Sequence, residues 1–118
     1  MLTSNLAFAL AFLRPSVRSG STERVAITGE VDLLSVGELE RWLRRVIAES
    51  RCRTIVLDLG GVEFLAARGV SVLLAAKRAA EEAGRDLQVR NAQGLPARVL
   101  TLLGLESWCR AEAGEGDR

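Results

Sequence analysis

The spacing of apolar positions divides the chain into alternating strands and helices. Thr54–Leu59 is almost continuously apolar, which is typical of a central parallel strand covered on both faces, and Gly60-Gly61 is expected to end it. Arg24–Val31 predicts another strand, and Leu87–Asn91, where apolar and polar residues alternate, predicts a further one. These three segments are predicted to form the centre of a sheet.

Three other segments have the spacing of amphipathic helices. In Leu34–Ser50, apolar residues recur at intervals of three and four, so that they share one face. Val70–Ala83 has a similar face and is followed by Gly84, where a helix C-terminal glycine belongs. Leu95–Leu103 predicts a shorter third helix.

The N-terminal part is less regular. Leu6–Leu13 alternates large apolar residues with alanine, which predicts a strand, and Arg14–Glu23 predicts a loop. A hairpin between Leu6–Leu13 and Arg24–Val31 would need a connection longer than usual. An apolar run this short cannot cross a bilayer, and no basic residue precedes it, so neither a membrane span nor a signal peptide is expected.

The element order predicts one α/β domain. Strands that alternate with helices indicate βαβ units, and 118 residues suit a single domain. We expect this domain over residues 1–110, with a central, mostly parallel sheet of four to five strands, an N-terminal antiparallel strand and helices packed on the sheet. The small, polar residues 111–118 predict a flexible C-terminal tail.

Composition argues against several functions. The chain has 16 basic and 15 acidic residues, without the basic excess of a nucleic-acid-binding surface. It contains no histidine, the usual general base and metal ligand. Cys52 and Cys109 make no zinc-type spacing and are typical of reduced thiols in a cytoplasmic protein. We therefore predict a cytoplasmic protein without a metal or cofactor.

The predicted start of the second helix breaks a local rule. Ala66, Ala67 and Arg68 stand where helices prefer Ser, Thr, Asp or Asn as caps. The helix dipole also disfavours a cation at this end. Such a break in an otherwise consistent unit marks a candidate functional site.

Three segments carry a family pattern. Ile27–Asp32 ends an apolar strand with TGEVD, Ile55–Leu74 joins a strand, a glycine-containing turn and a helix, and Leu87–Leu105 ends in Leu-Leu-Gly-Leu. At this spacing, and over roughly Leu6 to Trp108, the chain resembles the STAS domain, the family of anti-sigma-factor antagonists.

The resemblance implies a small regulatory protein with a STAS-like fold that binds another protein. In the antagonists, a serine in the loop after the third strand is phosphorylated by the partner anti-sigma factor, a serine kinase of the histidine-kinase-like ATPase type. The unphosphorylated form binds this partner and thereby frees the sigma factor.

The phosphorylation motif itself is altered in this chain. Phe64 and Leu65 match the family's apolar pair, and Gly69 also matches. Ala66 replaces the family's Asp, Ala67 replaces the first Ser, and Arg68 replaces the phosphorylated Ser. Because none of these three side chains has a hydroxyl group, phosphorylation at the family position is excluded.

Four interpretations of Arg68 stay open. It is a solvated surface residue without a role, or it pairs with an acidic group on a constitutively docked partner. It could also hold an anion together with free backbone N–H groups. In the fourth interpretation the phosphorylated residue has moved to Ser71, one helical turn further on, or to Ser35.

No acid–base site is expected. Asp32, Asp58 and Glu63 are the candidate carboxylates, but no nucleophile or metal cluster accompanies them, so we predict no enzyme and no catalytic residue. Asp32 is expected either to shape the docking surface or to cap the first helix, as Ser35 also could. Trp42 and Trp108 are expected to pack rather than to bind a ligand.

These inferences predict a non-enzymatic regulatory domain that binds an anti-sigma factor or a related protein kinase or ATPase. The residues predicted to contact this partner are Asp32, Leu33, Ser35, Leu65, Ala66, Ala67, Arg68, Gly69 and Val70. No nucleic acid and no direct membrane insertion are expected, and a homodimer stays open. The alternatives are a scaffold or adaptor subunit, in a signalling assembly or beside a transporter's ATPase, and a domain that binds a small anion or other ligand.

Overall fold

The computed structural model describes residues 17–109 of the chain as an α/β domain. The elements, in chain order, are β1 (Val17–Ser19), β2 (Thr22–Val31), α2 (Val36–Glu49), β3 (Thr54–Leu65), α3 (Ala67–Glu82), β4 (Asp86–Arg90) and α4 (Gly94–Leu102). Leu6–Leu13 and the expected tail at 111–118 lie outside the described residues.

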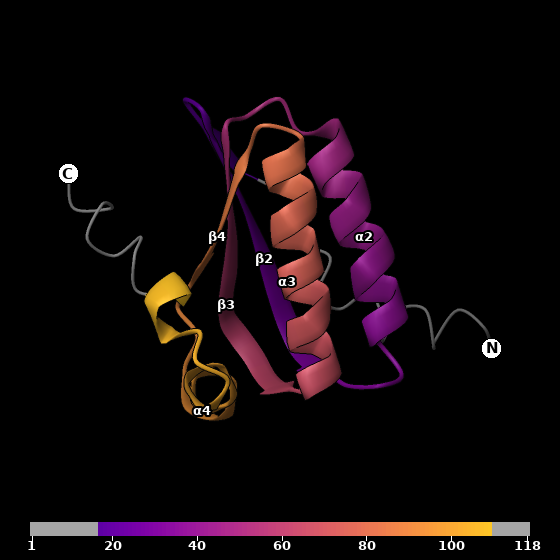
Figure 1. The fold of residues 1–118 in the computed structure, drawn as a ribbon, viewed down its shortest axis with the longest axis vertical. Coiled ribbons are helices and arrows are strands. Elements are labelled where there is room, and N and C mark those ends of the chain that lie inside the picture. Colours follow the sequence, from indigo (N-terminus) through magenta and orange to yellow (C-terminus); the bar gives the residue numbers. More distant parts are fainter. Residues whose placement is uncertain (1–16, 110–118) are drawn as a thin grey trace.

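The four strands form one sheet in the order β1-β2-β3-β4. β1 runs antiparallel to β2, whereas the pairs β2–β3 and β3–β4 are parallel. Helices α2 and α3 lie side by side across one face of the sheet, and α4 lies near the end of the sheet where α3 begins (Figure 1). The predicted α/β class, with its mostly parallel sheet and antiparallel first strand, is confirmed.

The hydrophobic core lies between the sheet and the two long helices. Alternate residues of β3, namely Ile55, Leu57 and Leu59, are at most 1% exposed. They belong to the same buried cluster as Leu39 and Leu43 of α2. Burial of each such side chain contributes roughly 1.5–3 kcal/mol before the entropy of folding is counted.

The loop expected over Arg14–Glu23 is wrong in the part that the structure describes. Val17–Ser19 forms β1, and β2 begins at Thr22, so that only Gly20 and Ser21 connect the two strands. Gly20 has a φ of 62°, the left-handed conformation that two-residue hairpin turns require. The Ser-, Arg- and Gly-rich composition thus encodes a tight hairpin.

The expected end of the central strand at Gly60-Gly61 is also wrong. β3 continues to Leu65, beside β2, with shifts in register along the pair. A Cβ atom on Gly61 would lie 2.6 Å from Cγ2 of Thr28, so that any other residue here would force the two strands or the Thr28 side chain to shift. The glycine therefore permits close approach of two strands here and does not terminate one.

The helices start or end within a few residues of the predicted bounds. α3 begins three residues before the expected Val70, and α4 is shifted one residue towards the N-terminus. Gly84 has a φ of 79°, and the N–H of Arg85 donates to the carbonyl of Ala80 at 2.8 Å. This confirms Gly84 as the residue that ends the second long helix.

Candidate partner-docking site at the carboxyl end of the sheet

The ends of β2 and β3 bring the β2–α2 loop next to the start of α3. The N–H of Ala66 donates to the carbonyl of Val31 at 2.9 Å, which joins the two segments directly. A Cβ atom on Gly69 would lie 2.7 Å from Cγ1 of Val31 and 2.9 Å from Cδ1 of Leu65. Only glycine at this position lets the first turn of α3 pack against both strand ends.

The β2–α2 loop is held by its own polar side chains. Oδ1 of Asp32 accepts hydrogen bonds from the backbone N–H groups of Leu34 and Ser35, at 3.0 and 3.1 Å. The hydroxyl of Ser35, a residue only 8% exposed, donates to the carbonyl of Glu30 at 3.0 Å. Ser35 occupies the N-cap position of α2 without a side-chain cap bond, so both polar residues shape the loop rather than cap the helix.

This ordered loop places two leucines in solvent. Leu33 is 70% exposed and Leu34 is 91% exposed. Phe64, near the end of the adjacent strand β3, is 41% exposed. Single exposed apolar residues are common, but two adjacent ones on a loop fixed by hydrogen bonds are candidates for contact with a partner.

The start of α3 lacks the usual features of a helix N-terminus. Ala66 is its N-cap residue, with extended backbone geometry and no side-chain cap bond, and its first turn contains no acidic residue. Arg68 is exposed, and within residues 17–109 no hydrogen bond or ion pair involves it. Its guanidinium group is therefore available to a partner.

The two substitute phosphorylation sites differ in access. Ser71 is exposed on the first turns of α3, where its hydroxyl lies 3.4 Å from the carbonyl of Ala67. Ser35 is buried, and its hydroxyl holds the β2–α2 loop. A kinase could reach Ser71 in this conformation, whereas access to Ser35 would require the loop to open.

The nine predicted docking residues lie at one end of the sheet, but they differ in their exposure to solvent. Leu33, Ala67 and Arg68 are exposed, Asp32 and Ala66 are half-buried, and Ser35, Leu65, Gly69 and Val70 are buried. Leu34 and Phe64 are not among the nine residues, because the apolar pattern places Leu34 in the helix and Phe64 matches only the family's apolar pair. We add both to the candidate surface.

The structure also shows the positions and contacts of the other residues considered from the sequence. Asp58 lies on β3, where its Oδ1 accepts from the N–H of Gly60 at 2.9 Å and its Oδ2 lies 3.6 Å from a guanidinium nitrogen of Arg24. Glu63 is exposed near the end of β3. Trp42 packs against the core, as expected.

The second tryptophan covers the edge of the sheet. The indole N–H of Trp108 donates to the carbonyl of Leu87 at 3.1 Å, and Nζ of Lys77 lies 6.0 Å from the ring centroid. Cys52 and Cys109 form no disulfide; the first is buried and the second half-buried. Over the part of the chain that the structure describes, no helix is long and apolar enough to span a membrane.

The structure is thus a small α/β domain in which the hydrogen-bonded β2–α2 loop lies beside the start of α3 and forms the candidate docking surface with it. A family model described as "Mlab, STAS domain" matches residues 16–109. The chain therefore belongs to the STAS domain family, and the matched region starts after Leu6–Leu13.

Solved structures agree with this assignment. The anti-sigma factor antagonist SpoIIAA in its unphosphorylated form is 20% identical, with a TM-score of 0.70, over 82% of this chain and 84% of that one. An anti-sigma factor antagonist from Mycobacterium paratuberculosis is 25% identical, with a TM-score of 0.70, over 80% of both chains. A sulfate transporter family protein from Wolinella succinogenes is 18% identical, with a TM-score of 0.63, over 79% of both chains.

Proposed function

We propose that this chain is a non-enzymatic regulatory domain that binds an anti-sigma factor or a related signalling ATPase. Binding occurs at the carboxyl end of the sheet, through Leu33, Leu34 and Phe64 together with Ala67 and Arg68. The domain acts in the cytoplasm by occupying its partner. The observation that carries this proposal is the exposure of two adjacent leucines on a hydrogen-bonded loop, beside an arginine that has no ion-pair partner within residues 17–109.

The chemistry of this surface suits a protein partner. Binding energy at interfaces concentrates in a few apolar and arginine side chains that become fully desolvated in the complex. The guanidinium of Arg68 offers a planar set of donors that matches a carboxylate. The buried residues Leu65, Gly69 and Val70 support this surface from beneath and make no direct contact.

The likeness to anti-sigma factor antagonists favours this class of partner. The residues at the helix start favour binding without phosphorylation there, because Ala66, Ala67 and Arg68 offer no hydroxyl group. Regulation would then depend on the amounts of the two proteins or on a different signal. Ser71, exposed one turn beyond Arg68, is the one accessible substitute among the two considered.

Titration with purified anti-sigma factors from the same genome tests the proposal. We expect at least one to bind, and Arg68→Asp to weaken its affinity at least tenfold through charge reversal. Arg78→Asp, an exposed arginine further along the same helix, is the matched control and should bind like the wild type. Equal affinity of both variants and the wild type would exclude docking at the start of α3.

Incubation with the bound kinase and labelled ATP tests the loss of phosphorylation. The wild-type chain should take up no phosphate, whereas Arg68→Ser restores a hydroxyl at the family position and should become labelled. Phosphate uptake by the wild type that disappears in Ser71→Ala would instead place the switch at Ser71.

An adaptor role is the second candidate, and it rests on the structural likeness to a sulfate transporter family protein. In that case the same surface would bind a subunit of a larger assembly. Size-exclusion chromatography with light scattering separates the two, because an adaptor remains in a stable complex whose composition does not depend on ATP or on a kinase.

A further inference from the structure

A cavity lies at the opposite end of the sheet from the docking surface. It has a volume of about 210 Å³ and opens between the β1–β2 hairpin and the last turns of α2. Glu23 and Ser50 form its buried part, and Trp42 and Val46 of α2 line it with apolar surface. Arg18, Arg45 and Glu49 complete the lining.

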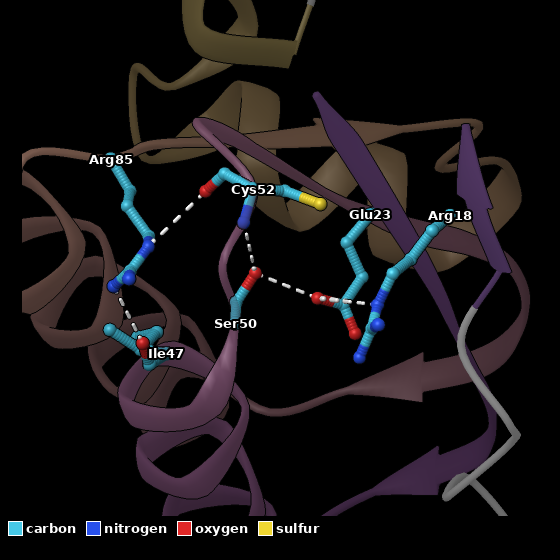
Figure 2. Close-up of polar contacts among 6 residues, drawn as sticks. All are labelled: Arg18, Glu23, Ile47, Ser50, Cys52 and Arg85. Carbon is cyan, nitrogen blue, oxygen red and sulfur yellow. Dashed lines mark hydrogen bonds and ion pairs between the residues drawn. The ribbon is translucent and has the colours of Figure 1, made fainter. Parts of the chain in front are cut away.

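The buried part of the cavity presents a fixed carboxylate. Glu23 is 6% exposed and Ser50 is 3% exposed. The hydroxyl of Ser50 donates to Oε1 of Glu23 at 2.7 Å and accepts from the N–H of Cys52 at 3.1 Å. Nε of Arg18 lies 3.9 Å from the same carboxylate oxygen. Figure 2 shows Arg18 and Ser50 on either side of Glu23, joined to it by dashed lines. The side chain of Glu23 is thus held in one orientation at low exposure.

The outer part of the cavity carries two further charges of opposite sign. Arg45 and Glu49 are exposed and lie one turn apart on α2. In the described portion of the chain neither makes an ion pair or a hydrogen bond, although Arg41 and Arg44 on the same helix pair with Glu38 and Glu40. A cation that precedes an acid by four residues is the less favourable order, which is consistent with this lack of pairing.

We propose that this cavity binds a free α-amino acid. Its ammonium group would lie against the carboxylates of Glu23 and Glu49, and its carboxylate against the guanidinium groups of Arg18 and Arg45. The indole of Trp42 and the side chain of Val46 would contact an apolar amino-acid side chain. Both signs of charge in so small a space fit a zwitterion better than an anion or a cation.

The size of the cavity supports a ligand of this class. Pockets for drug-sized molecules have volumes of roughly 300–1,000 Å³, so a cavity of about 210 Å³ suits a smaller compound. The cavity lies at the amino end of the sheet, so amino-acid binding there is independent of the function proposed for the carboxyl end.

Tryptophan fluorescence tests the proposal, because Trp42 lines the cavity and the other tryptophan, Trp108, lies elsewhere. In a Trp108→Phe variant, each of the common amino acids is titrated up to about 10 mM, the range of weak binding. At least one is expected to give a saturable change, and calorimetry on the wild-type chain should give the same dissociation constant. The N-acetyl and amide derivatives of that amino acid, which each lack one charge, should bind at least tenfold more weakly.

The test variants change exposed residues of the cavity, so that a folding defect does not obscure the result. Arg45→Met and Glu49→Gln should each weaken binding about tenfold. Arg44→Met and Glu40→Gln, which change a neighbouring charge pair outside the cavity, should leave it unchanged. Three results would overturn the proposal: no saturable binding of any amino acid by either method, equal binding by the blocked derivatives, or equal binding by Arg45→Met and Glu49→Gln.

Discussion

The two ends of the sheet differ in the side chains that they bury and expose. At the amino end, Ser50, Glu23 and the backbone of Cys52 satisfy one another in buried positions (Figure 2). At the carboxyl end, Leu33 and Leu34 face solvent on a fixed loop. One end thus holds buried polar groups within the fold, whereas the other exposes the apolar side chains that we propose bind a partner protein.

Arg85 extends the network at the amino end. Its Nη1 donates to the carbonyl of Ile47 at 2.9 Å, and its Nε donates to the carbonyl of Cys52 at 3.2 Å. α2 has no basic residue in its last turn, so an arginine from the segment before β4 supplies the positive charge that this helix end favours. The side chain thereby connects the last turn of α2 and the α2–β3 loop to the segment that precedes β4.

The largest stability effect should come from Ser50→Ala. This change removes both hydrogen bonds of the hydroxyl and leaves the buried carboxylate of Glu23 with one donor fewer, which costs about 2–3 kcal/mol. Urea denaturation measures the loss. Ser71→Ala, at an exposed serine of the other end, is the matched control and should change stability by less than about 0.5 kcal/mol. Equal effects would remove the distinction between the two ends.

Arg85→Met should have the next largest effect. The variant keeps much of the apolar stem but loses both bonds to backbone carbonyls, at a cost of about 1–2 kcal/mol because the site is only partly buried. The same denaturation assay applies, with exposed Arg98→Met as the control. A loss no greater than that of the control would show that Arg85 does not connect these segments.

Arg68→Asp should change stability in the opposite direction. An acid in the first turn of α3 interacts favourably with the helix dipole, where the arginine does not, so the variant should gain about 0.3–1 kcal/mol. The affinity of this variant for the partner should nevertheless decrease. A destabilised variant would mean that Arg68 stabilises the fold although it makes no hydrogen bond or ion pair within the described residues.

Leu34→Ser should have the smallest effect on stability. The side chain is 91% exposed, so its loss should alter the free energy of unfolding by less than about 0.5 kcal/mol. Affinity for the partner, measured by calorimetry, should nevertheless decrease by at least tenfold. Leu102→Ser, at an exposed leucine of α4, provides the control and should bind like the wild type.

The fold was largely predictable because its helices and central strands carry strong periodic patterns. Leu39, Leu43 and Ile47 repeat at helical intervals, and all three are buried where the pattern placed them. The errors fell at glycines. Gly20 and Gly61 were interpreted as loop and strand end, whereas one makes a two-residue turn and the other permits close contact of strands.

The candidate site was predictable only in part, because burial depends on tertiary packing. The sequence indicated the start of α3 through Ala66, Ala67 and Arg68, and the structure places these beside the β2–α2 loop. It could not indicate that Asp32 would fix this loop with Leu34 in solvent, because that follows from local hydrogen bonds. The network around Ser50 joins residues distant in sequence and left no pattern to detect.

Hydrogen exchange of the chain with and without its partner tests the docking surface most directly. We expect slower exchange of backbone amides in the complex at residues 32–35 and 66–70, with no change at residues 50–53 of the amino end. Protection confined to the amino end or to α4, with residues 32–35 and 66–70 unchanged, would contradict it.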